Sequence, residues 1–184
     1  MNLSEIENLV KEGEGQRLEY KETTGQRVEA CRTLCAFLNG QGGTVVFGVT
    51  HKGRLAGQFI ADTTKRDLFD AFQAFEPAAD VEVEYVQVDK THSAIVCRVE
   101  RGNCRPYVYD GKPYKRVQSS TTAMGQEEYE KMLVERGGFR QERGKVGKKS
   151  GQEKRKVGKK PHGLEVGKKT DFHRSFGADA KGKT

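Results

Sequence analysis

The 184-residue sequence lacks a hydrophobic run long enough to cross a lipid bilayer, so no segment of it is predicted to be a membrane-spanning helix. Residues 1–11 have an acidic, amphipathic pattern, whereas a signal peptide begins with basic residues followed by an apolar stretch. We therefore expect a cytoplasmic protein that does not associate with membranes.

Cysteine is scarce, and its four positions do not show the close paired spacing that is common in zinc sites. Cys31 and Cys35 fall on the apolar face of a predicted helix, four residues apart. We predict that they are buried thiols. No cofactor is expected from these residues.

Aromatic residues are almost absent from the C-terminal part, where only Phe172 and Phe176 follow Phe139. Residues 137–184 contain 15 Lys and Arg against 5 Asp and Glu, a net charge of +10, while residues 1–136 contain 18 against 21, a net charge of −3. We predict one folded domain over residues 1–136 and a low-complexity basic tail over residues 137–184.

The tail contains a short repeat with a glycine in each copy: residues 145–149 and 156–160 read KVGKK, and residues 165–169 read EVGKK. Such a segment cannot bury a core, so we expect it to be disordered. A basic tail attracts phosphate backbones regardless of their sequence, here through lysines such as Lys148, Lys149, Lys159 and Lys160. The alternative is a spacer with no selected role, and repetition alone does not decide between the two.

Residues 35–57 change from helical to strand periodicity across a glycine-rich turn. Apolar residues, including Val28, recur every three or four positions up to Leu38, and a β-branched run begins at Val45. Three glycines between them permit a tight connection from the helix to a core strand. The order of helix before strand, with no lysine after the last glycine, argues against a nucleotide-binding P-loop.

The remaining patterns predict an α+β domain with a mixed sheet of about five to seven strands and about four helices. Ser4 and Glu7 fit a capping box for a first helix, Thr122 is placed to cap the last helix, and Asp110-Gly111 predicts a hairpin turn. The other helices are expected over residues 27–38, 64–75 and 126–136. The strands are expected over residues 16–21, 44–49, 81–88, 94–99, 107–109 and 114–117.

Four motifs occur in a fixed order along the chain. They are Glu14 followed by Leu18-Glu-Tyr-Lys, AFLNGQGG over residues 36–43, Phe-Gly-Val at 47–49, and PYKRVQSST over residues 113–121. In this order they resemble the Schlafen AlbA-type domain family, over residues from about 12 to 134. The resemblance implies an α+β domain of a kind found in many bacterial transcriptional regulators, usually ahead of a helix-turn-helix region, and in Schlafen proteins that cleave structured RNA. Here a basic tail stands where a helix-turn-helix would follow.

The resemblance to Schlafen nucleases makes Glu14, Glu19 and Lys21 candidate catalytic residues, with Glu14 and Glu19 as ligands for magnesium or manganese. Glu19 and Lys21 point to the same face of the predicted strand. The third acidic residue of those enzymes would follow the central strand, where this sequence has Thr50 and His51.

Neither of those residues is a carboxylate, and histidine is a poor magnesium ligand, so the set is incomplete unless Asp62 or another acid completes it. The alternative is that Glu14 and Glu19 are solvated charges at a strand edge, with Glu19 paired to Lys21 or Arg17.

The second hairpin and the residues around it form a second candidate site, because they mix basic, aromatic and hydroxyl side chains suited to phosphate contact and base stacking. These residues are Arg105, Lys112, Tyr114, Lys115, Arg116, Ser119, Ser120 and Thr121. In the alternative interpretation, Tyr107 and Tyr114 pack across strands, Arg116 pairs with Glu14 or Glu19, and the hydroxyls cap a helix.

We therefore expect a nucleic-acid-binding protein without catalytic activity, with DNA favoured over RNA and a role in transcriptional regulation. One alternative is a divalent-metal-dependent endoribonuclease, and another is a degenerate module that binds protein partners. Exposed strand edges often pair, so a homodimer is a further expectation.

Overall fold

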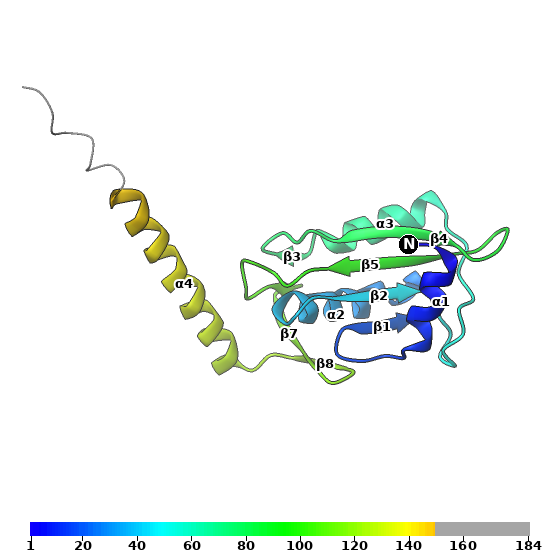
Figure 1. Cartoon of the computed structure of the whole chain (residues 1–184), viewed down its shortest axis with the longest axis horizontal. Helices are drawn as coiled ribbons and strands as arrows, with labels where there is room; N and C mark the ends of the chain where they lie inside the picture. Colours follow the sequence, from blue (N-terminus) through cyan, green and yellow to red (C-terminus); the bar gives the residue numbers. More distant parts are fainter. Residues whose placement is uncertain (150–184) are drawn as a thin grey trace, which may run out of the picture.

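The computed structural model describes residues 1–149, and the side chains of residues 1–137. Four α-helices and two four-stranded sheets form the α+β fold that was predicted (Figure 1). The helices are α1 (Leu3–Lys11), α2 (Arg27–Asn39), α3 (Asp62–Phe72) and α4 (Gln126–Lys149), and a 3₁₀ turn, η1 (Thr24–Gln26), precedes α2. The strands are β1 (Leu18–Lys21), β2 (Gly43–Phe47), β3 (Phe75–Glu76), β4 (Glu82–Gln87), β5 (Ser93–Val99), β6 (Val108–Tyr109), β7 (Lys112–Val117) and β8 (Ser120–Ala123).

The first sheet has the strand order β1-β2-β5-β4, in which only β1 and β2 run parallel. One of its two central strands, β2, is buried on both faces. Its side chains alternate between the two faces of the sheet, and each face is covered by helices. Val45 and Phe47 join the core beneath α2 and α3, while Val46 packs with Ile6 and Val10 of α1 on the opposite face. The first sheet therefore lies between α1 on one face and α2 and α3 on the other.

The second sheet is antiparallel, with the order β3-β6-β7-β8. Asp110 and Gly111 connect β6 to β7 with φ of 50° and 71°, which confirms the predicted hairpin turn. Strand β8 was not predicted, because its polar residues show no apolar alternation. Thr122 pairs with Lys115 inside this strand, so the prediction that it caps the last helix is wrong.

Helix α2 packs against both sheets and carries much of the core, including Leu34 and Phe37, which are fully or almost fully buried. Val28 was expected on its apolar face, yet it lies in the first turn of α2 and is 39% exposed. The helix ends at Asn39, where the predicted glycine turn begins.

Glycine is required in that turn for steric reasons. Gly42 has φ of +79°, and a Cβ atom there would lie 2.8 Å from the carbonyl oxygen of Val99. A Cβ atom on Gly43 would lie 2.7 Å from the ring of Phe37 and 2.8 Å from the carbonyl oxygen of Arg17. The turn brings α2, β2 and β5 too close together for larger residues.

Several element boundaries differ from the predictions, most clearly at α1 and α3. Helix α1 is capped by Asn2, whose side chain accepts from the Glu5 amide, so the capping box lies two residues before the predicted one. Helix α3 ends at Phe72, and Phe75 forms the short strand β3 opposite Tyr109. The two missed strands, β3 and β8, raise the total to eight strands, in two sheets where one was expected.

Helix α4 begins at Gln126, as predicted, and continues beyond the expected end at Arg136 to Lys149. Figure 1 shows that it starts beside β8 and runs away from both sheets. Disorder was predicted for residues 137–184, but residues 137–149 form the end of α4. Residues 150–184 lie outside the described residues. Among residues 1–149, no helix combines the length and apolar character that a membrane crossing requires.

Candidate nucleic-acid interface

Arg116 is a predicted phosphate contact, but its side chain lies inside the protein, and the residue is only 9% exposed. Its Nη2 donates to Glu19 Oε2 at 2.6 Å and to the Gly15 carbonyl at 2.9 Å, and its Nη1 donates to Thr121 Oγ1 at 2.9 Å. The guanidinium carbon lies 5.4 Å from the centre of the Phe37 ring. In this structure Arg116 thus holds β7 against β1 and is not part of an exposed phosphate-binding surface.

Glu19 is 8% exposed and also accepts a hydrogen bond from Lys21 Nζ through its other carboxylate oxygen. Glu19 and Lys21 point to the same face of β1, as predicted. The two cations compensate for the free-energy cost of burying the negative charge of this carboxylate. Of the alternatives drawn from the sequence, the pairing of Glu19 with Lys21 and the pairing of Arg116 with Glu19 are both present. The prediction that Glu19 is a solvated charge is wrong, because the residue is buried.

Glu14 is exposed, and its Oε1 accepts a hydrogen bond from the Tyr20 amide at 3.0 Å. The Gly15 amide donates to the Leu18 carbonyl at 2.9 Å, and Arg116 Nη2 donates to the same carbonyl at 3.3 Å. Leu18 and Tyr20 present these backbone groups on the side of β1 away from β2. Glu14 therefore helps to close the outer edge of the first sheet.

The candidate metal ligands do not assemble into a recognisable cation site in the described part of the chain, where no group of three or more His, Cys, Asp or Glu could hold a metal. His51 is exposed in the turn after β2, and Asp62 is exposed at the start of α3. Both oxygens of Glu19 already accept from cationic side chains. The donor set that is present fits a divalent ion poorly.

The exposed part of the second sheet keeps several predicted nucleic-acid contacts on the surface. Lys112 is exposed at the start of β7, and Ser119 and Ser120 are exposed at the turn into β8. Tyr114 is half-buried, and the guanidinium of Arg32, from α2, lies 6.0 Å from the centre of its ring. Sequence reasoning missed Arg32, which is exposed although its neighbours Cys31 and Thr33 are buried.

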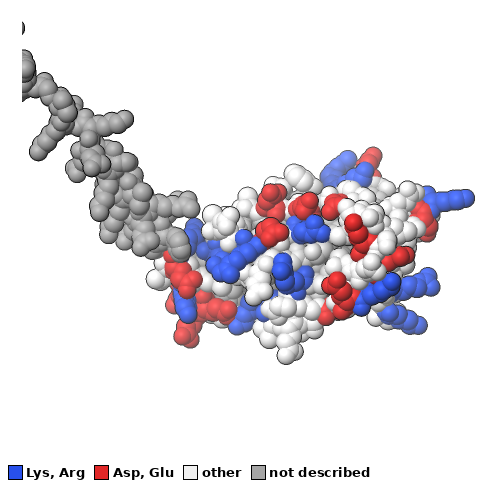
Figure 2. Space-filling view, in the orientation of Figure 1, with Lys and Arg blue, Asp and Glu red and all other residues white. Residues whose placement is uncertain are grey.

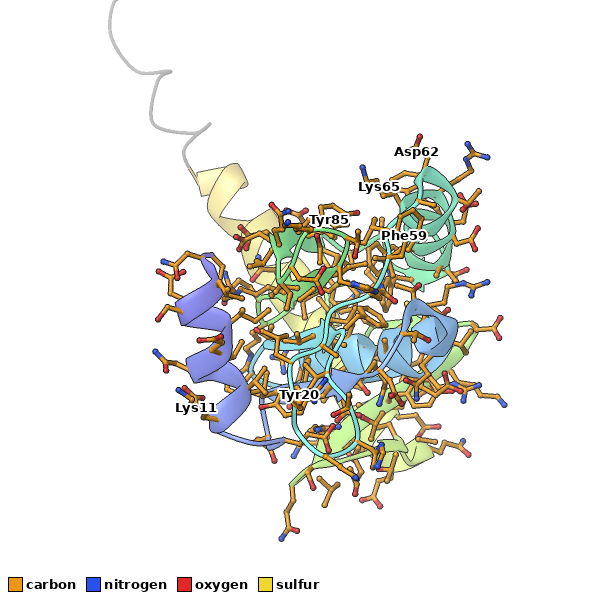
Figure 3. The ribbon with its side chains drawn as sticks, turned by 90° about the vertical axis from the view of Figure 1, so that its right-hand side faces the viewer. Lys11, Tyr20, Phe59, Asp62, Lys65 and Tyr85 are labelled. Carbon is orange, nitrogen blue, oxygen red and sulfur yellow. The ribbon has the colours of Figure 1, made fainter. Side chains whose placement is uncertain are left out.

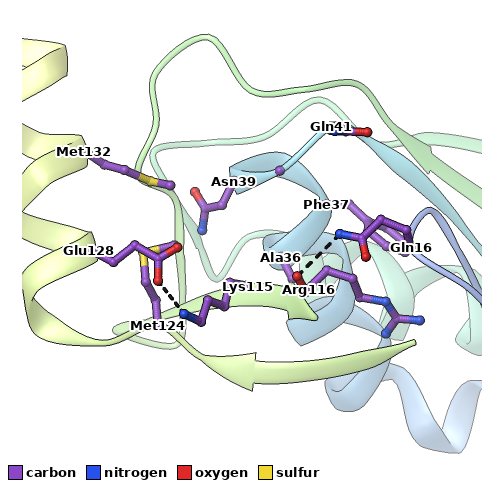
Figure 4. Close-up of a pocket in the computed structure, with 11 residues that line it drawn as sticks. Gln16, Ala36, Phe37, Asn39, Gln41, Lys115, Arg116, Met124, Glu128 and Met132 are labelled. Carbon is purple, nitrogen blue, oxygen red and sulfur yellow. Dashed lines mark hydrogen bonds and ion pairs between the residues drawn. The ribbon is translucent and has the colours of Figure 1, made fainter. Parts of the chain in front are cut away.

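Lys115, another predicted nucleic-acid contact, forms an ion pair with α4, in which its Nζ lies 2.5 Å from Glu128 Oε2. A cavity of about 130 Å³ lies beside this ion pair, between β7, α4 and the end of α2 (Figure 4). Gln16 donates to the Arg116 carbonyl at 3.5 Å in the same region. The ion pair attaches the start of α4 to the second sheet.

Arg105 is half-buried, and its Nη1 donates to the Asn39 carbonyl at 3.3 Å. Burial lowers the pKa of its guanidinium, and the nearby charge of Arg101 lowers it further. Arg136 of α4 donates to the Cys104 carbonyl in the same loop. Arg101 and Arg105 therefore lie near each other in the loop between β5 and β6, which Arg136 contacts from α4.

Asn39 connects α2 to the second sheet, a role that sequence reasoning missed. Its amide nitrogen donates to the carbonyls of Tyr107 and Tyr114, each at 2.9 Å, and its oxygen accepts from the Tyr107 amide at 2.7 Å. A buried side-chain amide can replace a strand partner in this way because it offers both donors and an acceptor.

The predicted tail lysines fall in two places. Lys148 and Lys149 lie at the end of α4, where side chains are not described, and Lys159 and Lys160 lie outside the described residues. Elsewhere, basic and acidic side chains are interspersed over the visible face of the domain (Figure 2). The described surface on this face therefore shows no single broad basic patch.

The prediction of buried thiols is confirmed, since Cys31, Cys35 and Cys97 are free and buried, while Cys104 is free and exposed. Burial raises the pKa of the Cys31 and Cys35 thiols to about 12. Burial raises the pKa of the Cys97 thiol as well. These thiols are therefore protonated at neutral pH and pack in the core.

The two sheets, the helix between them and the glycine turn define an α+β domain in which the motifs of the chain meet around β1, β2 and β7. The family model described as Schlafen, AlbA_2 matches residues 14–125, which is more than half of the chain. The chain belongs to this family.

Two solved structures are similar to this chain. The N-terminal domain of an ATP-dependent DNA helicase RecG-related protein from Nitrosomonas europaea is 20% identical, with a TM-score of 0.51, over 68% of this chain and 93% of that chain. The DIP2311 protein from Corynebacterium diphtheriae is 16% identical, with a TM-score of 0.45, over 62% of this chain but only 23% of that protein. No curated protein sequence matches the chain.

Proposed function

We propose that this chain binds nucleic acid, DNA in preference to RNA, and acts in transcriptional regulation without catalysing a reaction. The observation that carries the proposal is the distribution of charge: the +10 tail begins within α4, a helix that starts at Gln126, shortly after the end of β8 at Ala123. The tail supplies contacts to phosphates that do not depend on base sequence. Membership in the AlbA_2 family supports the same class of function.

The folded domain contributes a smaller contact surface made by Arg32, Lys112 and Tyr114, with the hydroxyls of Ser119 and Ser120 at the next turn. Arg32 over the ring of Tyr114 offers a cation and an aromatic edge close together, which suits contact with phosphates and bases of a flexible strand. Lys112 adds an exposed charge on the same strand as Tyr114. Preference for DNA is suggested by the fold shared with the RecG-related domain, whose name refers to a DNA helicase.

The proposed function includes no metal-dependent cleavage step, because the two carboxylates that such a step would use form hydrogen bonds and ion pairs within the protein. Glu14 closes the edge of β1, and Glu19 neutralises Arg116 and Lys21.

The test is a fluorescence anisotropy titration of labelled duplex DNA, single-stranded DNA and an RNA hairpin with the full chain at two salt concentrations. Replacing Lys148, Lys149, Lys159 and Lys160 by Gln should weaken binding to every probe. It should also flatten the dependence of log K on log salt, by roughly one for each lysine that no longer neutralises a phosphate.

A second variant, Arg32→Gln with Lys112→Gln, should weaken binding to single strands more than to duplex. The matched control is Lys11→Gln with Lys90→Gln, which removes exposed lysines from α1 and from the β4–β5 loop. Absence of binding at low salt would refute the proposal, and equal effects of the paired and control variants would restrict the binding site to the tail.

A further inference from the structure

A groove of about 420 Å³ lies between α3 and β4, on a different part of the domain from β7 and β8. Six apolar side chains form most of its wall: Leu68, Phe69, Phe72, Phe75, Val83 and Tyr85. Phe69 is 62% exposed and Tyr85 is 44% exposed. Figure 3 shows Lys65 above Tyr85, and Lys65 Nζ lies 5.5 Å from the centre of that ring. The groove therefore leaves aromatic surface open to solvent.

The groove is bordered by an open edge of the first sheet. The Val88 amide donates to the His92 carbonyl at 2.9 Å, and β4 pairs with β5 from Glu82↔Arg98 to Gln87↔Ser93. Hydrogen-bonded pairs alternate in an antiparallel ladder, so every second residue of β4 directs its backbone away from β5. These residues are Val83, Tyr85 and Gln87.

No described residue forms a hydrogen bond with those three outward-facing backbones, which contrasts with the opposite edge of the sheet. There, Glu14 and Arg116 bond to the outer backbone groups of β1. An unprotected edge next to an apolar groove has the form of sites that accept an extended peptide as an added strand.

The charge of this region selects a basic peptide. Residues 62–89, which form α3, β3 and β4, contain eight Asp and Glu against two Lys and Arg, a net charge of −6. The tail of the same chain has a net charge of +10. Within it, Leu164, Val166, Phe172 and Phe176 all fall on even-numbered positions, so an extended backbone would direct them to one face. Three basic residues, Lys168, Lys169 and Arg174, lie among them with two acidic ones, Glu165 and Asp171, so residues 164–176 have a net charge of +1.

We propose that residues 164–176 of this chain bind in the groove as an added strand beside β4. The even-numbered apolar side chains contact Phe69, Tyr85 and the groove floor, while the basic side chains meet the acidic residues of α3 and β4. The 15 residues from Lys149 to Leu164 span up to about 50 Å when extended, more than the roughly 36 Å of α4, so the segment can return past the start of that helix.

This binding site goes beyond nucleic-acid binding and does not depend on it. It has one consequence for the proposed function: a tail held in the groove has fewer lysines free for phosphates. Nucleic acid and the groove therefore compete for the same segment.

The test uses a fluorescein-labelled synthetic peptide of residues 164–176, titrated in the absence of nucleic acid. The acceptor is the full chain with Phe172→Ser and Phe176→Ser, which removes competition by its own segment. We expect saturable binding that weakens by about tenfold or more when Phe69→Ser is added, because the peptide then has one aromatic ring fewer to pack against. The control is Phe59→Ser, since Phe59 is 70% exposed and does not line the groove.

Phe69 and Phe59 are both exposed, so neither substitution disturbs the core. The unaltered chain should bind the labelled peptide more weakly than the Phe172→Ser, Phe176→Ser chain. It should also protect the amides of Val83, Tyr85 and Gln87 better against hydrogen exchange. Absence of peptide binding, equal affinity for a scrambled peptide, or equal effects of Phe69→Ser and Phe59→Ser would each overturn the proposal. None of these results depends on whether the chain binds nucleic acid.

Discussion

Glu19 and Arg116 are 97 residues apart in the sequence, and their side chains meet at 2.6 Å inside the protein. The pair joins β1 of the first sheet to β7 of the second, and Lys21 adds a second cation to the same carboxylate. Two residues that the motifs suggest for catalysis and for phosphate binding thus neutralise each other. Their contact explains why both occur in the family motifs of this chain without requiring either to touch a ligand.

Arg116→Met should destabilise the protein by about 3–5 kcal/mol, because it leaves the buried carboxylate of Glu19 with one cation fewer. Glu19→Met should have a similar effect. The combination of both substitutions should cost less than the sum of the two, since no uncompensated charge remains from the pair. Denaturant unfolding measures this, with Lys112→Gln as an exposed control. Additive effects would show that the contact contributes little.

The full chain should not cleave a structured RNA in the presence of manganese, since the oxygens of Glu19 accept from cations and no third acid joins Glu14 among the described residues. A gel assay of labelled tRNA-like RNA measures this. Glu14→Gln is the informative variant, because Glu14 is exposed and a Gln oxygen can still accept from the Tyr20 amide. Cleavage by the unaltered chain that disappears in folded Glu14→Gln would contradict the prediction, whereas loss in Glu19→Gln alone could follow from unfolding.

Gly43→Ala should destabilise the protein by roughly 1–3 kcal/mol, because the added methyl group would overlap the Phe37 ring and the Arg17 carbonyl. The matched control is Gly125→Ala, since a Cβ atom there meets nothing within 4 Å. Thermal unfolding of the two variants gives the comparison. A neutral Gly43→Ala would mean that α2 and β2 can separate at no cost.

One thiol in four should react with a thiol-specific reagent in the folded protein, namely Cys104, and all four should react after denaturation. The buried thiols also predict the direction of pH dependence. Folding raises the pKa of Cys31 and Cys35 from the ordinary value of 9.0 to about 12, so their contribution to stability is complete below pH 9 and declines as pH rises toward 12. Replacing both by Ala should reduce this alkaline loss; an unchanged pH profile would point to other groups.

Local patterns were sufficient for much of the fold. The helical spacing around Leu34 predicts α2, and Asp110-Gly111 predicts the β6–β7 turn. Alternation predicts that Glu19 and Lys21 share a face. Strand β8 could not be predicted from the sequence, because Thr121 and Thr122 belong to no apolar pattern. These residues form a strand by pairing with β7.

The candidate site shows the same division. Composition alone separates the acidic domain from the basic tail, but no sequence pattern singled out Arg32. Local patterns cannot place Arg32 over Tyr114 or bury Arg116, because these contacts join segments far apart in the chain.

The amino-acid sequence by itself determined the motifs, the charge of the tail and the order of most helices and strands, because each depends on neighbouring residues. Only the tertiary structure decided which edge of the first sheet is closed and which charged groups are neutralised. Those outcomes depend on distant segments meeting in a space where every buried donor and charge needs a partner.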